Sequence, residues 1–350
     1  MAESPIAMHA TYMPFLFIFK NFLFLRFKTK KKPAVTLSEI IRPIEKEFAA
    51  FEALYANEIR GMAKPLLGKL DGHKQGKMLR PVLVLLSAAI CGGAVDDTYH
   101  TAVAVELLHT ATLFHDDVID EADTRRDNPS LNAQWGNKTA VLVGDYLLAQ
   151  ALSHLTKNEN RNVILSILEA AQCMGRGELS QMHNTNATSL DEKDYMDVIS
   201  DKTAALLSAC CRTGALTAHA NTSQTEALAN YGMYFGVAFQ MRDDMLDYGT
   251  ANIGKPLCSD LNEGKLTLPI IAHLNTLDDG EKKTIIEDIK KRRNLNTIAD
   301  AVRKGAGMDY TESKIKEQTE LAIRQLELFE PSETRTALEQ MALYCAIREK

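Results

Sequence analysis

The stretch that decides the fold covers residues 103–120 and reads VAVELLHTATLFHDDVID. Its apolar residues recur at three- and four-residue spacing, which is the period of a buried helix. This expected helix ends in an aspartate cluster of the form Asp-Asp-x-x-Asp, made by Asp116, Asp117 and Asp120. Because residues i and i+4 share one face of a helix, Asp116 and Asp120 are expected to project together, with Asp117 about 100° round the axis.

A second cluster, made by Asp243, Asp244 and Asp247, repeats this spacing and ends the apolar helix expected over residues 233–241. A single cluster of this kind is explained equally well as a solvent-exposed helix end without a function. Carboxylates are disfavoured at a helix C-terminus, and two such groups at the ends of buried helices need a compensating cation. Oxygen-only ligand sets suit hard divalent ions, and Mg²⁺ commonly binds through carboxylates together with substrate phosphates. The pair of clusters therefore predicts a Mg²⁺–diphosphate clamp.

Basic residues are placed as such a clamp requires. They precede the helix expected over 82–89, follow each aspartate cluster, or lie beside Thr203 in the helix expected over 198–215: Lys77, Arg80, Arg125, Arg126, Lys202, Lys255 and Lys265. Each one alone is compatible with an ordinary surface charge. Together they supply the ammonium and guanidinium groups that two diphosphates need. The chain has no Walker A loop, no GxGxxG, no HExxH and no CxxC, so nucleotide and zinc chemistry are not indicated.

Composition limits the class of protein. The chain has 350 residues, of which 45% are hydrophobic, so its bulk is globular rather than disordered. No uncharged run reaches the about 18 apolar residues of a membrane-spanning helix. The net charge of −6 gives no reason to expect nucleic acid as a partner. Six cysteines without regular spacing favour a reducing, cytoplasmic compartment. Helix-forming residues dominate and alternating strand patterns are absent, which predicts one large all-α domain.

The N-terminal segment differs from this body. Residues 1–35 carry a net charge of +5, against −11 for the rest, and hold six of the twelve phenylalanines. We expect residues 1–36 to form a poorly ordered basic and aromatic extension, and residues 37–350 to form the catalytic domain. A membrane-surface anchor and a targeting segment stay open for the extension, although its lysine cluster follows the apolar run, the reverse of a signal peptide.

Taken together, these motifs resemble the trans-prenyltransferases, also called polyprenyl synthetases, over roughly residues 41–346. The resemblance includes Phe239-Gln240 before the second cluster and the segments 254–256 and 260–269 after it. The runs 106–115 and 136–149 are similar to bacterial octaprenyl and related quinone side-chain synthases, the long-chain branch. Three positions depart from the family pattern: Met78 where Arg is frequent, and Asp127 and Cys258 where Gly is common.

The resemblance implies an isoprenoid-synthase-type helical bundle around a central active-site cavity. It implies head-to-tail condensation of isopentenyl diphosphate with an allylic diphosphate, with about three Mg²⁺ ions on Asp116, Asp120 and Asp243. Asp117, Asp244 and Asp247 would support them. The implied contacts to the allylic diphosphate are Arg125, Lys202, Thr203, Gln240 and Lys255. The implied contacts to isopentenyl diphosphate are Lys77, Arg80, His109 and Arg126. A homodimer and a peripheral membrane contact for product release are implied as partners.

Product length is expected to depend on the face of the helix before Asp116. Short-chain members of the family carry large aromatic residues four or five positions before the motif, where this chain has Thr112 and Ala111. With Leu108 further down, these small side chains predict a product of about six to ten isoprene units, octaprenyl first. Substituting Phe for Ala111 or Thr112 is expected to shorten it. The alternative is that these small residues serve helix packing only.

Four other interpretations stay open at this point. A class I terpene cyclase also carries one DDxxD, but lacks the second and the Lys77, Arg80 and His109 set. A catalytic or regulatory subunit of a heteromeric synthase is another: non-catalytic subunits typically lose aspartates, whereas all six are present here, but a catalytic chain could still need a partner for long-chain output. A shorter-chain farnesyl or geranylgeranyl synthase and a helical interaction protein are the remaining alternatives. Mg²⁺-dependent thermal stabilisation by diphosphate would exclude the last.

Overall fold

The computed structural model describes residues 35–61, 76–125, 128–185, 191–249 and 258–348. The predictions for Arg126, Lys255 and residues 1–34 lie outside these described residues. Within them the chain is almost entirely helical, which confirms the all-α prediction. The exception is one pair of two-residue strands, which the sequence did not predict. Strand β1 (Thr124–Arg125) pairs antiparallel with β2 (Asn128–Pro129), with Thr124 opposite Pro129. None of the helices in the described part is long and apolar enough to cross a bilayer.

Helices make up nearly all of the described residues. In order they are α2 (Leu37–Ile41), η1 (Arg42–Ile44), α3 (Glu45–Gly61), α4 (Leu79–Ile90), α5 (Asp96–Ile119), α6 (Leu131–Trp135), α7 (Asn137–Leu155), α8 (Arg161–Asn184), α9 (Glu192–Ile199), η3 (Ser200–Ala204), α10 (Ala205–Thr217), α11 (Thr222–Asp247), α12 (Ser259–Glu263), α13 (Leu268–Leu274), α14 (Asp279–Lys290), α15 (Leu295–Lys304), α16 (Ala306–Gln325), η4 (Leu326–Leu328) and α17 (Glu333–Ile347).

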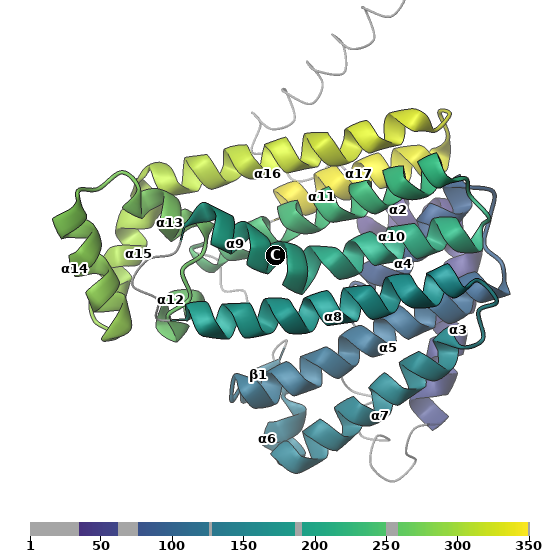
Figure 1. Cartoon of the computed structure of the whole chain (residues 1–350), viewed down its shortest axis with the longest axis horizontal. Coiled ribbons are helices and arrows are strands. Elements are labelled where there is room, and N and C mark those ends of the chain that lie inside the picture. Colours follow the sequence, from purple (N-terminus) through teal and green to yellow (C-terminus); the bar gives the residue numbers. More distant parts are fainter. Residues whose placement is uncertain (1–34, 62–75, 126–127, 186–190, 250–257, 349–350) are drawn as a thin grey trace, which may run out of the picture.

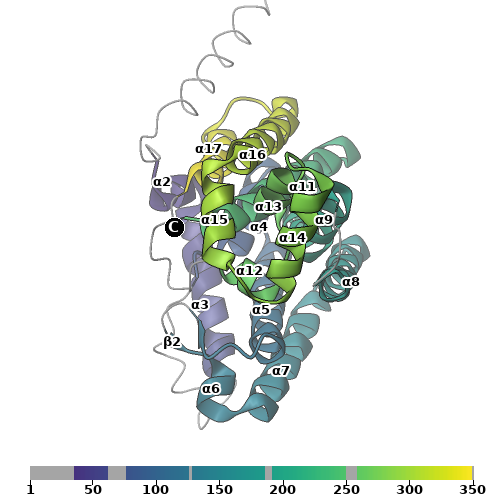
Figure 2. The same ribbon diagram turned by 90° about the vertical axis from the view of Figure 1, so that its left-hand side faces the viewer.

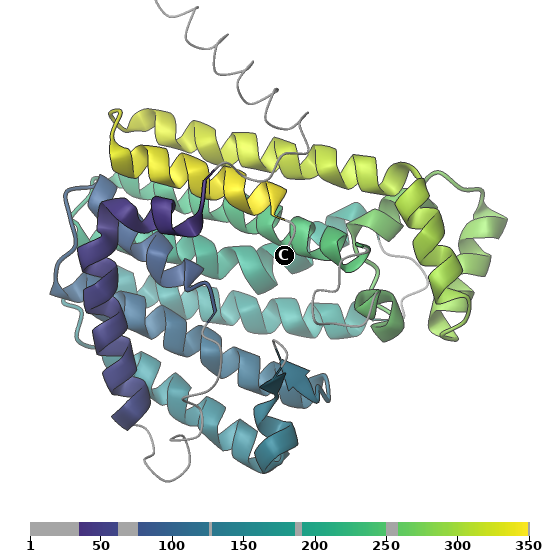
Figure 3. The same cartoon turned by 180° about the vertical axis from the view of Figure 1, so that it is seen from behind.

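The long helices lie side by side around a buried centre (Figure 1). Helix α10 packs on α4, α8 and α11, while α5 packs on α4 and α7, and α11 on α16. Residues 82–86 of α4 are fully buried, as expected for a helix that is apolar all round. Seen from behind, α2 and α3 lie on the outside and α17 runs next to α2 (Figure 3). The last described residues thus return to the middle of the molecule.

The single helix predicted over residues 198–215 is interrupted. Helix α9 passes through the π-helical turn η3, which carries Lys202 and Thr203, before α10 begins. Two glycines allow neighbouring helices to approach this turn. A Cβ on Gly177 of α8 would lie 2.5 Å from the backbone nitrogen of Lys202, and one on Gly236 of α11 would lie 2.5 Å from Ala204 Cα. Such π-turns are frequent at functional sites, and this one is fixed from both sides.

Candidate active site

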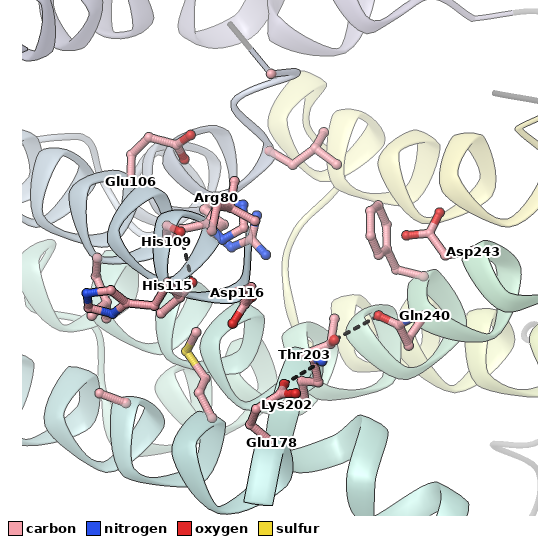
Figure 4. A pocket seen from close by; sticks show the side chains of 18 of the residues that line it. Arg80, Glu106, His109, His115, Asp116, Glu178, Lys202, Thr203, Gln240 and Asp243 are labelled. Carbon is pink, nitrogen blue, oxygen red and sulfur yellow. Dashed lines mark hydrogen bonds and ion pairs between the residues drawn. The ribbon is translucent and has the colours of Figure 1, made fainter. Parts of the chain in front are cut away.

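A cavity of about 920 Å³ lies among α4, α5, α8, η3, α11 and the C-terminal end of the chain. Most of the predicted site residues in the described part line it: Lys77, Arg80, Leu108, His109, Thr112, Asp116, Asp120, Arg125, Lys202, Thr203, Gln240 and Asp243. Figure 4 shows Asp116 on α5 and Asp243 on α11 facing each other across this space, with Lys202 and Thr203 between them. Residues separated by more than 100 positions in the sequence therefore share one cavity.

The first aspartate cluster divides into two parts. Asp116 and Asp120 line the cavity, whereas Asp117 is buried at 2% exposure and faces Arg125. Arg125 Nε donates to both carboxylate oxygens of Asp117 at 2.8 and 2.9 Å, and its Nη2 lies 2.6 Å from Oδ1. This bidentate pair holds the β1 hairpin against the end of α5. Arg125 therefore lines the cavity while its side chain is held by Asp117 of the first aspartate cluster.

The carboxyl of Asp116 is held in an unfavourable electrostatic environment. Burial raises its pKa to about 6, while the ammonium of Lys202 opposes this rise and the carboxylates of Glu178 and Asp120 add to it. The cations among the described residues therefore do not offset the cost of burying the charged form of Asp116. A site with this excess of partly buried carboxylate suits an additional cation.

The second cluster is tied into the protein at all three positions. Asp243 lines the cavity and forms an ion pair with Arg348. Asp244 is buried and accepts hydrogen bonds from Tyr195 Oη at 2.6 Å and Gln240 Nε2 at 2.8 Å. Asp247 is also buried and caps the start of α12, accepting bonds from the backbone nitrogens of residues 259 and 260 at 3.1 Å. Only the first aspartate of this cluster faces the cavity.

The polar residues of η3 join the two sides. Lys202 forms an ion pair with Glu178 of α8, and Thr203 Oγ1 donates to Gln240 Oε1 at 2.8 Å. Gln240 in turn donates to Asp244, so Thr203, Gln240 and Asp244 form a continuous chain. These bonds fix Gln240 with its amide next to Asp243, which Figure 4 shows one turn along α11.

The basic residues predicted for isopentenyl diphosphate lie at another part of the same cavity. Arg80 of α4 and His109 of α5 are side by side (Figure 4). Lys77 lines the cavity too, with its Nζ 5.6 Å from the ring centre of Tyr344 in α17. Lys265 lies elsewhere: it lines an adjoining pocket of about 210 Å³ with Asp120 and Lys202. The cavity thus offers two cationic regions, one near the aspartates and one between α4 and α5.

A family model described as polyprenyl synthetase matches residues 70–314. This chain belongs to the polyprenyl synthetase family. The octaprenyl diphosphate synthase of Haemophilus influenzae is 34% identical over 286 residues, covering 79% of this chain and 87% of that protein. A decaprenyl diphosphate synthase structure from Rhodobacter capsulatus superposes with a TM-score of 0.83 at 32% identity, covering 89% of this chain and 98% of that chain. A polyprenyl synthase from Caulobacter crescentus CB15, solved with calcium and isoprenyl diphosphate, gives 0.83 at 28% identity, covering 91% and 100%.

Family membership confirms the predicted resemblance and makes the chain a prenyltransferase, a trans-prenyl diphosphate synthase of isoprenoid biosynthesis. The predicted isoprenoid-synthase-type bundle is confirmed with it. The interpretations as a class I terpene cyclase and as a purely structural helical protein no longer apply. The substrates of this class of synthase are isopentenyl diphosphate and an allylic diphosphate.

Sequence reasoning missed Arg348, a charged residue of this prenyl synthetase site. Arg348 lines the cavity, pairs with Asp243, and places its guanidinium carbon 4.0 Å from the ring centre of Phe239. Its carbonyl oxygen accepts bonds from Arg242 Nη2 at 2.7 Å and Nε at 2.9 Å, which fixes the chain there. No motif spacing marks this residue. The only signal was a basic residue in the segment that follows the last apolar helix.

The residues predicted to control product length in this prenyl synthetase are not equivalent in the fold. Leu108 and Thr112 line the cavity, together with Leu148 of α7 and Met174 of α8. Ala111 is buried at 2% exposure among core side chains and is not part of the cavity lining. It lies on α5 about 100° round the axis from Thr112, which turns it towards the core. Of the two small residues, Thr112 alone lines the cavity.

The donor set of this prenyl synthetase fits a hard divalent cation. Among the described residues, no three His, Cys, Asp or Glu side chains converge into a closed metal cage. The carboxylates instead stand on two walls of one cavity, with Asp116 under-compensated by the surrounding cations. Mg²⁺ commonly binds through one or two carboxylates, with substrate phosphates completing its octahedron. Asp116, Asp120 and Asp243 line the same cavity and are the residues that would hold such an ion.

Proposed function

We propose that this prenyltransferase is a Mg²⁺-dependent long-chain trans-polyprenyl diphosphate synthase with a product of about eight isoprene units for a quinone side chain. One observation supports this most strongly. Asp116 and Asp243 face each other across a cavity whose α5 wall, between the diphosphate region and Leu108, carries the small Thr112. Leu108 lies about 12 Å below Asp116 along the helix, because α-helices rise 1.5 Å per residue.

We assign the charged residues to two substrates. Lys202, Arg125 and Gln240, with Thr203 orienting Gln240, contact the allylic diphosphate. Lys77, Arg80 and His109 hold isopentenyl diphosphate, with Arg126 and Lys255, which lie outside the described residues, completing the two sets. Asp116, Asp120 and Asp243 would hold about three Mg²⁺ ions, which when bound would supply positive charge against the allylic diphosphate.

In the reaction, the C–O bond of the allylic diphosphate breaks and its electron pair stays on the diphosphate. Lys202 and Arg125 stabilise the charge that develops there, in a cavity partly removed from water. The double bond of isopentenyl diphosphate, held by Arg80 and its neighbours, attacks the allylic carbon and forms the new C–C bond. A proton then leaves C2 of the former isopentenyl unit, which restores a double bond, and the released diphosphate takes it up. This route requires no side chain as a dedicated general base.

We further propose that residues 37–350 form one catalytic domain preceded by the extension 1–36, and that the enzyme works as a homodimer in the cytoplasm. The six cysteines are all free in the structure, and four of them are buried. Free buried thiols are compatible with a reducing compartment.

The test is product sizing with purified chain, Mg²⁺, farnesyl diphosphate and labelled isopentenyl diphosphate. A ladder that ends near eight units supports the proposal, and a product of three or four units would retain the chemistry and reject the long-chain assignment. Thr112→Phe is expected to shorten the product by several units, because it narrows the cavity below Asp116. Ala111→Phe is the matched comparison: it should mainly destabilise the core, because overpacking costs about 1–3 kcal/mol. An unchanged product in Thr112→Phe would place the growing chain elsewhere.

A further inference from the structure

Four side chains beside the active-site cavity form one continuous chain of hydrogen bonds. At its far end, Tyr195 Oη donates to Asp244 Oδ2 at 2.6 Å. Gln240 Nε2 donates to the other oxygen of Asp244, Oδ1, at 2.8 Å, and Gln240 Oε1 accepts from Thr203 Oγ1 at 2.8 Å. The chain therefore runs from a buried tyrosine, which no step of the proposed reaction uses, to a hydroxyl in the cavity wall.

Helix α9 places this tyrosine. Its buried residues Tyr195, Val198 and Ile199 are spaced by three and four positions, which puts them on one face of the helix. Asp191 caps the start of α9, where its side chain accepts from a backbone nitrogen at 2.7 Å. Helix α9 packs on α11 and α13, and Figure 2 shows α9 next to α11. Because α9 continues into η3, one segment carries both the tyrosine and Thr203.

Asp244 fixes the direction of the hydrogen bonds. An ionised carboxylate accepts hydrogen bonds and donates none, so Tyr195 and Gln240 must both donate to it. Gln240 thereby commits its amide NH₂ group to Asp244, which leaves its carbonyl oxygen for Thr203. The Thr203 hydroxyl must then donate to Gln240, and only the lone pairs of its oxygen remain for the cavity that it lines.

A purely structural link between α9 and α11 would not need a charged partner at this point. Asp244 is 6% exposed, and both of its donors are neutral groups. Burying a carboxylate with neutral partners costs more than burying an amide of the same size, which could bridge the same two groups. An amide at position 244 could also donate, however, so Gln240 could turn over and the Thr203 hydroxyl could reverse. The carboxylate excludes that reversal.

We propose that Tyr195 is a positioning residue for catalysis. Through the two residues of α11 between them, Tyr195 holds the Thr203 hydroxyl so that an oxygen lone pair, not a proton, faces the allylic carbon. That carbon becomes positively charged when the C–O bond of the allylic diphosphate breaks, and a fixed lone pair stabilises the charge. The position of the allylic carbon beside Thr203 rests on the proposed function.

The first variant is Tyr195→Phe, which removes the hydroxyl and keeps the ring. The measured quantity is the rate of the first condensation in a single turnover, with Mg²⁺, farnesyl diphosphate and labelled isopentenyl diphosphate. This rate should fall roughly 5–20-fold, as expected when a hydrogen bond to a charged group is lost. The concentration of isopentenyl diphosphate that gives half of the maximal rate should change by less than about twofold, because Arg80 and His109 lie at another part of the cavity.

Tyr310→Phe is the matched control for this variant. Tyr310 Oη donates to Glu192 Oε2 of the same helix α9, also at 2.6 Å, but on the exposed surface. Its removal should leave the rate of condensation unchanged. An unchanged rate in Tyr195→Phe as well would overturn the proposal.

A double-mutant cycle separates positioning from a structural role. Thr203→Val removes the hydroxyl that is oriented, so adding Tyr195→Phe to it should slow the reaction by less than about twofold. Thr203→Ser keeps a hydroxyl, and in that background Tyr195→Phe should keep its full effect. Equal slowing by Tyr195→Phe in the Thr203→Val background and in wild type would overturn the proposal, because the tyrosine would then act without that hydroxyl.

Asp244→Asn tests the same chain if Tyr195→Phe does not fold, as judged by circular dichroism and thermal unfolding. It keeps the size of the side chain and allows Gln240 to turn over. It should therefore slow the first condensation by at least roughly fivefold in wild type, and much less in the Thr203→Val background. Equal slowing in both backgrounds would again contradict the positioning role.

One further measurement keeps failure of the positioning role distinct from failure of the proposed function. The Mg²⁺-dependent thermal shift with inorganic diphosphate should be kept in Tyr195→Phe, because the chain of bonds does not include Asp116, Asp120 or Asp243. Loss of that shift would overturn the proposal, since the tyrosine would then act on the metal site. A wild type that catalyses no condensation would overturn the proposed function and the positioning role together, whereas equal slowing in both backgrounds overturns the positioning role alone.

Discussion

The two aspartate clusters have the same spacing and different surroundings. At the end of α5, Asp116 and Asp120 face the cavity and the buried Asp117 holds Arg125. At the end of α11, only Asp243 faces the cavity and already carries Arg348 as a counter-ion, while the other two aspartates bind Tyr195 and the start of α12. The same aspartate spacing therefore has two different results. At the end of α5 it places two carboxylates in the cavity, and at the end of α11 two of its three carboxylates make structural hydrogen bonds.

The largest expected effect separates these roles at Asp116. Asp116→Asn should lower kcat by roughly 10²–10³-fold, since it removes a group placed to stabilise the leaving diphosphate through Mg²⁺. The same substitution should raise the thermal stability of the metal-free protein, because it removes a carboxylate that burial disfavours. Steady-state kinetics and thermal unfolding in a chelator measure the two effects. Asp197→Asn on the exposed face of α9 is the control and should change neither.

Asp247→Asn is expected to lower the stability of the protein more than its activity. Its carboxylate accepts two backbone N–H groups and the Ser259 hydroxyl, at 2.7 Å, at the start of α12. Losing the charge there should cost about 1–2 kcal/mol of unfolding free energy, as for other helix caps. Activity should change much less than in Asp116→Asn. If activity fell as far as it does in that variant without loss of stability, the scaffold role of this residue would be wrong.

The pH dependence of stability should also show that burial disfavours the charged form of Asp116. The pKa of Asp116 is raised from 3.8 to about 6, so the folded state retains a proton that the unfolded state has lost between these values. Stability therefore falls as pH rises through this window, and the loss is complete above about pH 6. In metal-free buffer, the gain in melting temperature of Asp116→Asn over wild type should be small near pH 4 and reach its full size above pH 6. A constant gain at every pH would contradict this.

The smallest effect is expected at Arg348. Its guanidinium pairs with Asp243 and would compete there with a metal ion, so Arg348→Gln should lower the Mg²⁺ concentration needed for stabilisation with inorganic diphosphate, roughly two- to fivefold. Arg348→Lys keeps a positive charge and should stay close to wild type. The measurement is a Mg²⁺ titration followed by thermal unfolding. A higher Mg²⁺ requirement in Arg348→Gln would mean that the ion pair positions Asp243 for metal instead of competing with it.

Much of this organisation could be predicted from the sequence. The helix class follows from the period of the apolar residues, and Asp116 with Asp120 could be placed on one face because i and i+4 coincide. The structure also shows why glycine is common in the family at position 258. Cys258 has a φ of 59°, a left-handed backbone conformation that favours glycine.

Other features depend on how the helices pack against one another, which the spacing of apolar residues along the sequence does not specify. The π-turn at Lys202 arises where α8 and α11 close in through Gly177 and Gly236. Ala111 and Thr112 are neighbours in the sequence, and only the helix rotation set by the core turns one to the cavity. Arg348 reaches Asp243 because α17 returns to the middle of the molecule, a contact between residues 105 positions apart.

The measurement that tests the central claim most directly is the thermal shift caused by inorganic diphosphate with and without Mg²⁺. If the clusters hold diphosphate through shared Mg²⁺, diphosphate should stabilise the wild type only when Mg²⁺ is present. Asp116→Asn and Asp243→Asn should each lose most of that shift. Equal stabilisation by diphosphate in a chelator, or a full Mg²⁺-dependent shift in both variants, would contradict the account.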